Sequence, residues 1–113
     1  MRMMLKAVFD TDAASEVMSS GQGAEVNRRL IERFQPEAFY AFTDDGQRAI
    51  LMVFDMADTS QIPALTEPMY QQGKAKVTLT PCMNREDLET GFEESWPVKW
   101  RLCKASPRNS PAI

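Results

Sequence analysis

At the centre of the chain lies Gly46-Gln47-Arg48-Ala49-Ile50-Leu51-Met52-Val53-Phe54-Asp55, in which six consecutive apolar side chains stand between a turn signal and an acidic end. Successive side chains of a β-strand point to opposite faces of its sheet, so a strand with one wet face alternates apolar and polar residues. This segment does not alternate, which predicts a strand that is covered on both faces. Helices can cover one face, and the cover of the second face is the main question that the sequence raises.

The length and composition of the chain are those of one small globular domain. Of its 113 residues, 43% are hydrophobic and 26% are charged, so a single core is expected. No window approaches the ~18 uncharged apolar residues of a membrane span, and the first apolar run is too short for a signal peptide. We therefore expect a cytoplasmic protein that does not associate with membranes.

Two cysteines and no histidine disfavour a disulfide framework, a metal site and proton transfer by imidazole. We expect Cys82 and Cys103 to be free thiols, and we expect no metal and no cofactor. Residues 1–94 carry 9 Lys and Arg against 16 Asp and Glu, whereas residues 95–113 carry 4 Lys and Arg and no acid. An acidic body argues against nucleic acid as a partner, because phosphate binding needs a basic face.

The N-terminal third predicts a strand followed by a broken helix. Met3–Phe9 is a strand with apolar residues on nearly both faces, and either Thr11 or Asp12 can cap the helix that follows. That helix should extend over Ala13–Phe34. It is expected to break or bend at Ser19–Gly23, where two glycines disfavour helical structure.

The next segment predicts a hairpin with the central strand. Gln35-Pro36 ends the helix, because proline disfavours the helical conformation of the residue before it, and Ala38–Phe42 follows as a strand. Asp45-Gly46 lies between two apolar runs and is a hairpin signal, because glycine adopts the positive φ that tight turns require. The two strands are therefore expected to be antiparallel neighbours.

The rest of the acidic body predicts a helix, an edge strand and a short final helix. A helix should extend over about Ser60–Gln72 and bend at Pro68, because proline removes a backbone hydrogen bond. Lys74–Thr80 alternates apolar and polar residues, as a half-exposed edge strand does. A helix should then extend to about Phe92, with Asn84 as its N-cap.

The chain is expected to comprise one domain over residues 1–94 and a basic extension over residues 95–113. In the extension, Trp96, Val98, Trp100 and Leu102 follow a weak strand pattern. Their large apolar side chains lie beside an acidic body, so we expect the extension to dock on a protein surface.

The order of these elements predicts an α+β fold, namely a ferredoxin-like βαββαβ antiparallel sheet with its helices on one face. The strands, numbered along the chain, are expected in the order 4-1-3-2. The two central strands of this order are the two that are apolar on both faces. A helix-free face of this kind exposes more apolar area than a soluble monomer usually shows, so we expect a homodimer that packs sheet against sheet.

A resemblance to known proteins rests on the segments Gln35–Tyr40, Val53–Ala64, Glu67-Pro68, Pro81–Met83 and Glu86–Leu88. Together they resemble a family of short bacterial proteins, over about residues 1–93 of this chain, and members of that family resemble the dimeric α+β barrel superfamily. In that superfamily two ferredoxin-like sheets pack face to face, so the resemblance implies this fold and this dimer. The family brings no established activity and no catalytic residues that can be transferred.

In dimeric barrel proteins that act on small molecules, the ligand lies between the sheet and the helices of each protomer. The polar residues of this chain that could reach such a site are Tyr40, Arg48, Glu67 and Tyr70. Glu67 precedes a proline that frees a backbone carbonyl, and Tyr70 lies one turn further along the same side of the helix. The pattern favours a packed aromatic residue at Tyr40 over a catalytic acid, and a surface carboxylate at Glu67 over a site residue.

Three functions remain open at this stage, because fold alone does not choose among them. The first is a homodimeric small-ligand-binding or structural protein. The second is a cofactor-independent enzyme of the monooxygenase or isomerase kind, which would depend on Glu67 or a tyrosine for proton transfer in the absence of histidine. The third is a regulatory protein-interaction module that uses the basic extension. We expect the first.

Overall fold

The structure is a computed structural model, and it describes residues 1–95. The chain divides into one compact unit over Met1–Cys82 and a second unit that begins at Met83. The domain boundary after Glu94 stays a prediction, and the strand pattern and the cysteine of the basic extension lie outside the described residues. No helix within the described range is long and apolar enough to cross a bilayer.

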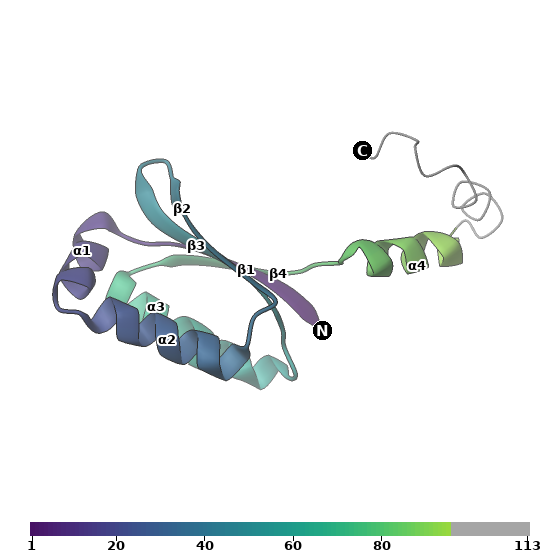
Figure 1. Ribbon diagram of the computed structural model, residues 1–113, viewed down its shortest axis with the longest axis horizontal. Coiled ribbons are helices and arrows are strands. Elements are labelled where there is room, and N and C mark those ends of the chain that lie inside the picture. The colour runs from purple at the N-terminus through teal and green to yellow at the C-terminus, as the bar shows by residue number, and fades with distance from the viewer. Residues whose placement is uncertain (96–113) are drawn as a thin grey trace. The chain divides into compact units, whose positions relative to one another are not determined.

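The first unit is built on four antiparallel strands, which are β1 (Arg2–Val8), β2 (Ala38–Asp44), β3 (Gln47–Asp55) and β4 (Lys76–Pro81). They lie side by side in the order β2-β3-β1-β4 (Figure 1), so β1 and β3 are central and β4 is an edge strand, as predicted. The α+β class and the four-stranded antiparallel sheet are confirmed.

The predicted first helix is divided into α1 (Thr11–Ser19) and α2 (Gln22–Phe34). The break lies at Gly21, whose φ of 80° is readily adopted only by glycine, so the predicted interruption is confirmed. The predicted N-cap of α1 was wrong, because the side chain of Asp10 accepts the hydrogen bond from the Ala13 N–H at 3.1 Å. Asp10 can do so because its own backbone is extended, whereas the residues after it are already helical.

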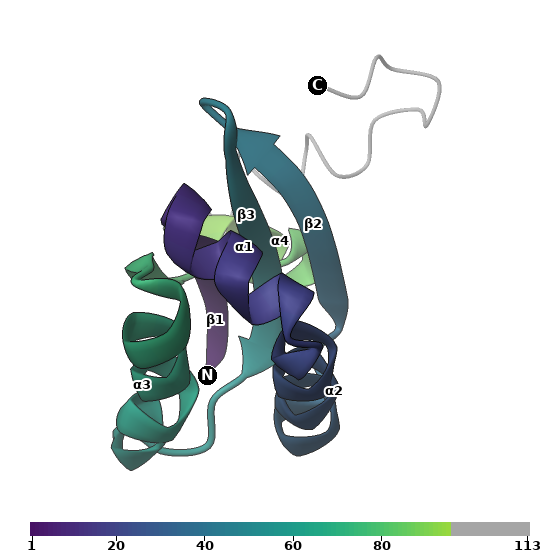
Figure 2. The same ribbon diagram turned by 90° about the vertical axis from the view of Figure 1, so that its left-hand side faces the viewer.

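A 3₁₀ turn, η1 (Thr59–Gln61), leads into α3 (Ile62–Gly73). Pro68 lies inside α3, and a bend at this residue stays a prediction. Figure 2 shows that α1, α2 and α3 all lie on one side of the sheet. Because α1 and α2 both lie between β1 and β2 in the chain, the element order contains one more helix than the predicted βαββαβ order.

The pleat of β1 and β3 separates their side chains into two sets. One set is buried in the core with residues of α2 and α3, and it comprises Met3, Leu5, Ala7, Ile50, Met52 and Phe54. The Phe54 ring packs edge to face against Phe34 of α2, with 5.5 Å between the ring centroids. Leu65 of α3 is also fully buried. The core thus lies between the sheet and its three helices.

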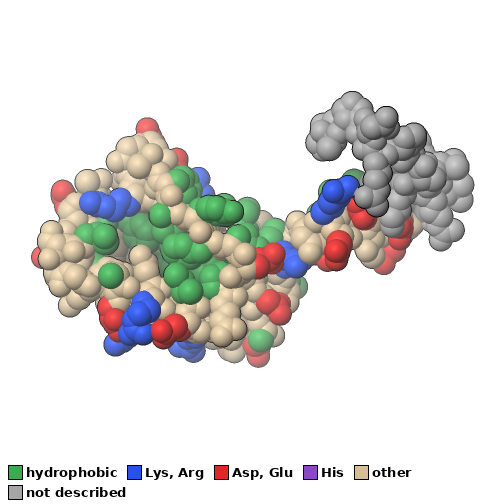
Figure 3. Space-filling view, in the orientation of Figure 1, with side chains coloured by type: hydrophobic (Ala, Val, Ile, Leu, Met, Phe, Trp, Pro, Cys, Tyr) green, Lys and Arg blue, Asp and Glu red, His purple; other side chains and the backbone are tan. Residues whose placement is uncertain are grey.

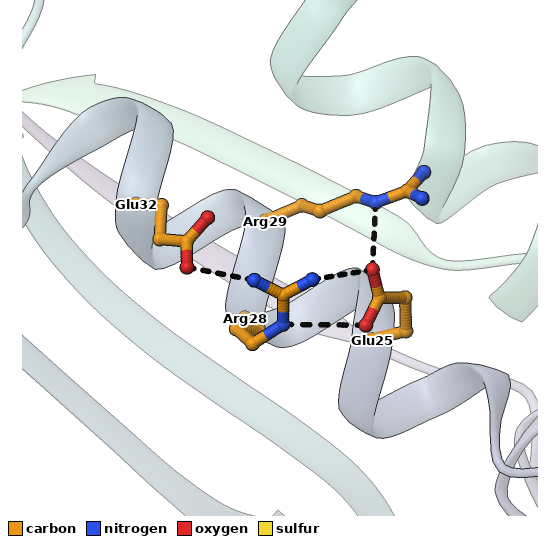
Figure 4. A network of polar contacts seen from close by, with 4 residues as sticks. All are labelled: Glu25, Arg28, Arg29 and Glu32. Carbon is orange, nitrogen blue, oxygen red and sulfur yellow. Dashed lines mark hydrogen bonds and ion pairs between the residues drawn. The ribbon is translucent and has the colours of Figure 1, made fainter.

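The outer surface of α2 carries an ion-pair network (Figure 4). Arg28 bonds Glu25 at 2.6 Å and Glu32 at 2.7 Å, and Arg29 bonds Glu25 at 3.0 Å. These partners are three or four residues apart, the spacing that places helical side chains side by side. The hydrogen bond from Arg28 lowers the pKa of Glu25.

The described part of the second unit is the helix α4 (Arg85–Ser95). Asn84 caps it as predicted, because the Asp87 N–H donates to Asn84 Oδ1 at 2.7 Å and the Asn84 N–H donates to Asp87 Oδ2 at 3.2 Å. Such reciprocal bonds satisfy backbone donors that have no partner within the helix.

Candidate functional site

A cavity of about 220 Å³ lies between the helix-covered face of the sheet and the helices α1, α2 and α3. Figure 3 shows hydrophobic side chains gathered where the surface is hollowed between the sheet and α2. The apolar residues that line the cavity include Phe9, Ala14, Val17, Met18, Val26, Leu30, Ala41, Ile50, Pro68 and Met69. An apolar molecule that entered the cavity would leave water and contact apolar side chains, which is favourable.

Two glycines let the backbone come close to the cavity wall. Gly23 of α2 lies against Met18 of α1, where an added Cβ would come within 2.6 Å of the Met18 sulfur. Gly73 at the end of α3 lies against the ring of Phe9, which leaves no room for a Cβ. Both glycines line the cavity, so its shape depends on residues that have no side chain.

Arg48 is the one charged residue among those that line the cavity. It is on the same face of β3 as Ile50 and Met52, because side chains two residues apart share a face. Its Nη1 donates a hydrogen bond to Ser15 Oγ of α1 at 3.0 Å. The Phe9 N–H donates to the Arg48 carbonyl at 2.9 Å, which anchors the backbone from which the guanidinium extends.

Asn27 of α2 and Gln72 of α3 also line the cavity and add neutral amide groups. Sequence reasoning missed both of them, and it also missed Ser15. The three-residue and four-residue spacing of Gly23, Asn27 and Leu30 was an available signal for one helix face. Nothing in the sequence marks Ser15, since its role depends on how α1 packs against β3.

The structure does not bring the four predicted site residues together. Arg48 lines the cavity, whereas Tyr40 pairs with Leu51, which places it on the other face of the sheet, and it is 64% exposed. Glu67 is exposed and accepts a hydrogen bond from Gln71 Nε2 at 3.2 Å. Tyr70 is 44% exposed. Ligand binding by Tyr40, Glu67 and Tyr70 stays a prediction.

The other face of the sheet is left uncovered by α1, α2 and α3 (Figures 1 and 2). The strand pleat places these apolar residues on it: Met4, Val8, Ala38, Tyr40, Leu51 and Val53. We call this set the open sheet face. Lys6 is on the same face and bonds Asp44 at 2.9 Å. The open sheet face thus combines apolar residues of three strands with an ion pair whose lysine lies in the central strand β1.

Asp55 lies at the end of β3, where it accepts a hydrogen bond from the α-amino group of Met1 at 2.7 Å. This bond, together with the positive charge of the amino group, lowers the pKa of Asp55. The pairing holds the start of β1 beside the end of β3.

A second hollow of about 430 Å³ is lined mainly by polar residues, among them Lys6, Asp44, Asp45, Lys74 and Lys76. Its charges are of both signs, and Lys6 is already paired with Asp44. It therefore favours neither an anion nor a cation. Within residues 1–95, no group of three or more His, Cys, Asp and Glu side chains is arranged to hold a metal ion.

Comparisons of the chain with protein-family models, with curated proteins and with solved structures found no match. The function is therefore inferred from the geometry of the fold and its cavity. That geometry provides an apolar space for one small molecule and a single cation at its wall.

Proposed function

We propose that this protein is a homodimeric small-ligand-binding protein, whose ferredoxin-like sheets pack face to face as in a dimeric α+β barrel. The cavity on the helix-covered face carries the proposal. An apolar cavity of about 150 Å³ engineered into another protein binds benzene, and the cavity here measures about 220 Å³. It can therefore accept a molecule of about one ring with a short substituent.

The open sheet face supports the homodimer. Its apolar residues come from three adjacent strands, and Tyr40 is 64% exposed there in a single chain. A second copy of the same face would cover these side chains together with the ion pair that joins Lys6 of the central strand β1 to Asp44. The resemblance to dimeric α+β barrel proteins suggests the same arrangement.

Binding is preferred to catalysis because the groups considered for proton transfer do not line the cavity. Glu67, Tyr40 and Tyr70 are exposed, and the lining contains no carboxylate. The regulatory alternative depends on the basic extension, which lies outside the described residues. No observation on residues 1–95 favours it.

A benzene titration followed by methyl NMR tests the cavity. The methyl signals of Val17, Val26, Leu30 and Ile50, which line the cavity, should shift and saturate. The methyl signals of Val53, which belongs to the open sheet face, serve as the internal control and should change little. If benzene left the four lining residues unchanged, the cavity would not be a binding site and the proposed function would be wrong.

Sedimentation velocity at micromolar concentration tests the dimer. The wild-type chain should sediment as a dimer, and Val53→Asp should sediment as a monomer because it would bury an unpaired charge between the sheets. Thr43→Asp is the matched control, since Thr43 pairs with Arg48 on the helix-covered face and its replacement should leave the dimer intact. A wild-type monomer would refute this part of the proposal.

A further inference from the structure

The wall of the cavity contains the positively charged side chain of Arg48. A purely apolar ligand would not interact with this charge. The guanidinium of Arg48 has one hydrogen-bond partner within residues 1–95, which is the hydroxyl oxygen of Ser15. A guanidinium carries five N–H donors, so most of its donors remain for water or a ligand. Arg28 and Arg29 of α2 differ from Arg48, because both are bonded to carboxylates.

The lining around Arg48 contains no opposite charge. Its other members are apolar residues, two glycines, Asn27 and Gln72, none of which neutralises a cation. A ligand carboxylate would be the first negative charge in the site, and guanidinium groups bond carboxylates through two parallel N–H donors. The site thus has the two parts needed for an anion with an apolar body.

The single cation also limits the charge of the ligand. A second negative group would lie against residues such as Leu30 and Met69, where an unpaired charge is strongly disfavoured. A phosphate ester carries up to two negative charges at neutral pH, and the lining provides no second cation. A monocarboxylate fits the site better than a phosphate or a dicarboxylate.

We propose that the cavity binds a small monocarboxylic acid, whose carboxylate is bonded by Arg48 and whose apolar body, about one ring in size, fills the space between the sheet and the helices. This inference rests on the proposed function, since it names the ligand class of the same cavity. Arg48 both orients the molecule and selects the acid over neutral molecules of the same shape.

Calorimetric titration with phenylacetate and with phenylacetamide tests the proposal, because the two probes differ mainly in charge. The wild-type protein should bind phenylacetate about tenfold more tightly than phenylacetamide, the lower range for a hydrogen bond to a charged group. Arg48→Met should bind the two probes equally. Arg48→Lys, which keeps the charge and loses the planar pair of donors, should retain part of the preference.

Two further variants locate the binding site. Arg33→Met removes a cation from the exposed end of α2, outside the cavity lining, and should keep the wild-type preference. Ala41→Phe adds a ring to the cavity wall and should weaken the binding of both probes. Arg48 is exposed, so its variants should fold, which circular dichroism verifies.

Each remaining outcome overturns a defined part of the proposal. Equal binding of acid and amide by the wild-type protein, together with the benzene response, would refute the role of Arg48 and leave the ligand cavity standing. An acid preference that survived in Arg48→Met, or unchanged binding of both probes by Ala41→Phe, would place the ligand elsewhere and refute the inference. If phenylacetate, phenylacetamide and benzene all failed to bind, the proposed function would be wrong as well.

Discussion

Replacing Phe54 with alanine should lower the free energy of unfolding by about 3–5 kcal/mol, the usual loss for a buried phenylalanine. Phe54 is fully buried, and its ring packs edge to face against Phe34 at 5.5 Å between centroids. Such a ring pair contributes about 0.5–1.5 kcal/mol beyond the area that it buries. The total is a large fraction of the ~5–15 kcal/mol that stabilise a typical domain.

Urea titration followed by circular dichroism measures this loss, with all variants at one protein concentration because association adds to apparent stability. Tyr70→Ala is the matched control, since Tyr70 is 44% exposed on α3, and it should cost less than about 1 kcal/mol. A double-mutant cycle with Phe34→Ala isolates the ring contact. The assigned core would be refuted if Phe54→Ala lowered the free energy of unfolding no more than Tyr70→Ala does, with the slope of that free energy against urea concentration unchanged.

Three further predictions concern turns, caps and ion pairs. Gly46→Ala should destabilise the protein by about 1 kcal/mol, because the φ of Gly46 is 79° and a Cβ disfavours that region; an unchanged urea midpoint would contradict this. Asn84→Ala should lower the helix content of α4 and cost about 1 kcal/mol, whereas Thr90→Ala should not, as hydrogen exchange of the α4 amides would show. The pKa of Glu25 is lowered by its hydrogen bond from Arg28, so its stabilisation is present at neutral pH and disappears as the pH falls through that lowered pKa. The wild-type protein should thus exceed Glu25→Gln in urea midpoint at pH 7 and lose this advantage well below pH ~4, and an advantage that persisted in acid would contradict the assignment.

The candidate site was predicted less well than the fold. Arg48 and Tyr40 show the reason. Both belong to the β2–β3 hairpin, yet the observed register places their side chains on opposite faces of the sheet. A shift of one residue in pairing would reverse this relation, and the pattern of β2 and β3 is apolar on both faces. The helix lining was missed for a related reason, because the contact between Ser15 and Arg48 joins residues 33 positions apart in the chain.

Local pattern alone determined that β3 is a strand with apolar residues on both faces, that Asp45-Gly46 closes a hairpin, that the first helix breaks near Gly21 and that β4 is an edge strand. Each of these depends on backbone preferences or on the period of the side chains over a few residues, which the sequence states directly. Only the tertiary structure decided which face of β3 the helices cover. Because Ile50 and Leu51 are equally apolar, either face could have been chosen, and the packing of α1, α2 and α3 selected the one that leaves Arg48 inside the cavity wall and Val53 on the open sheet face.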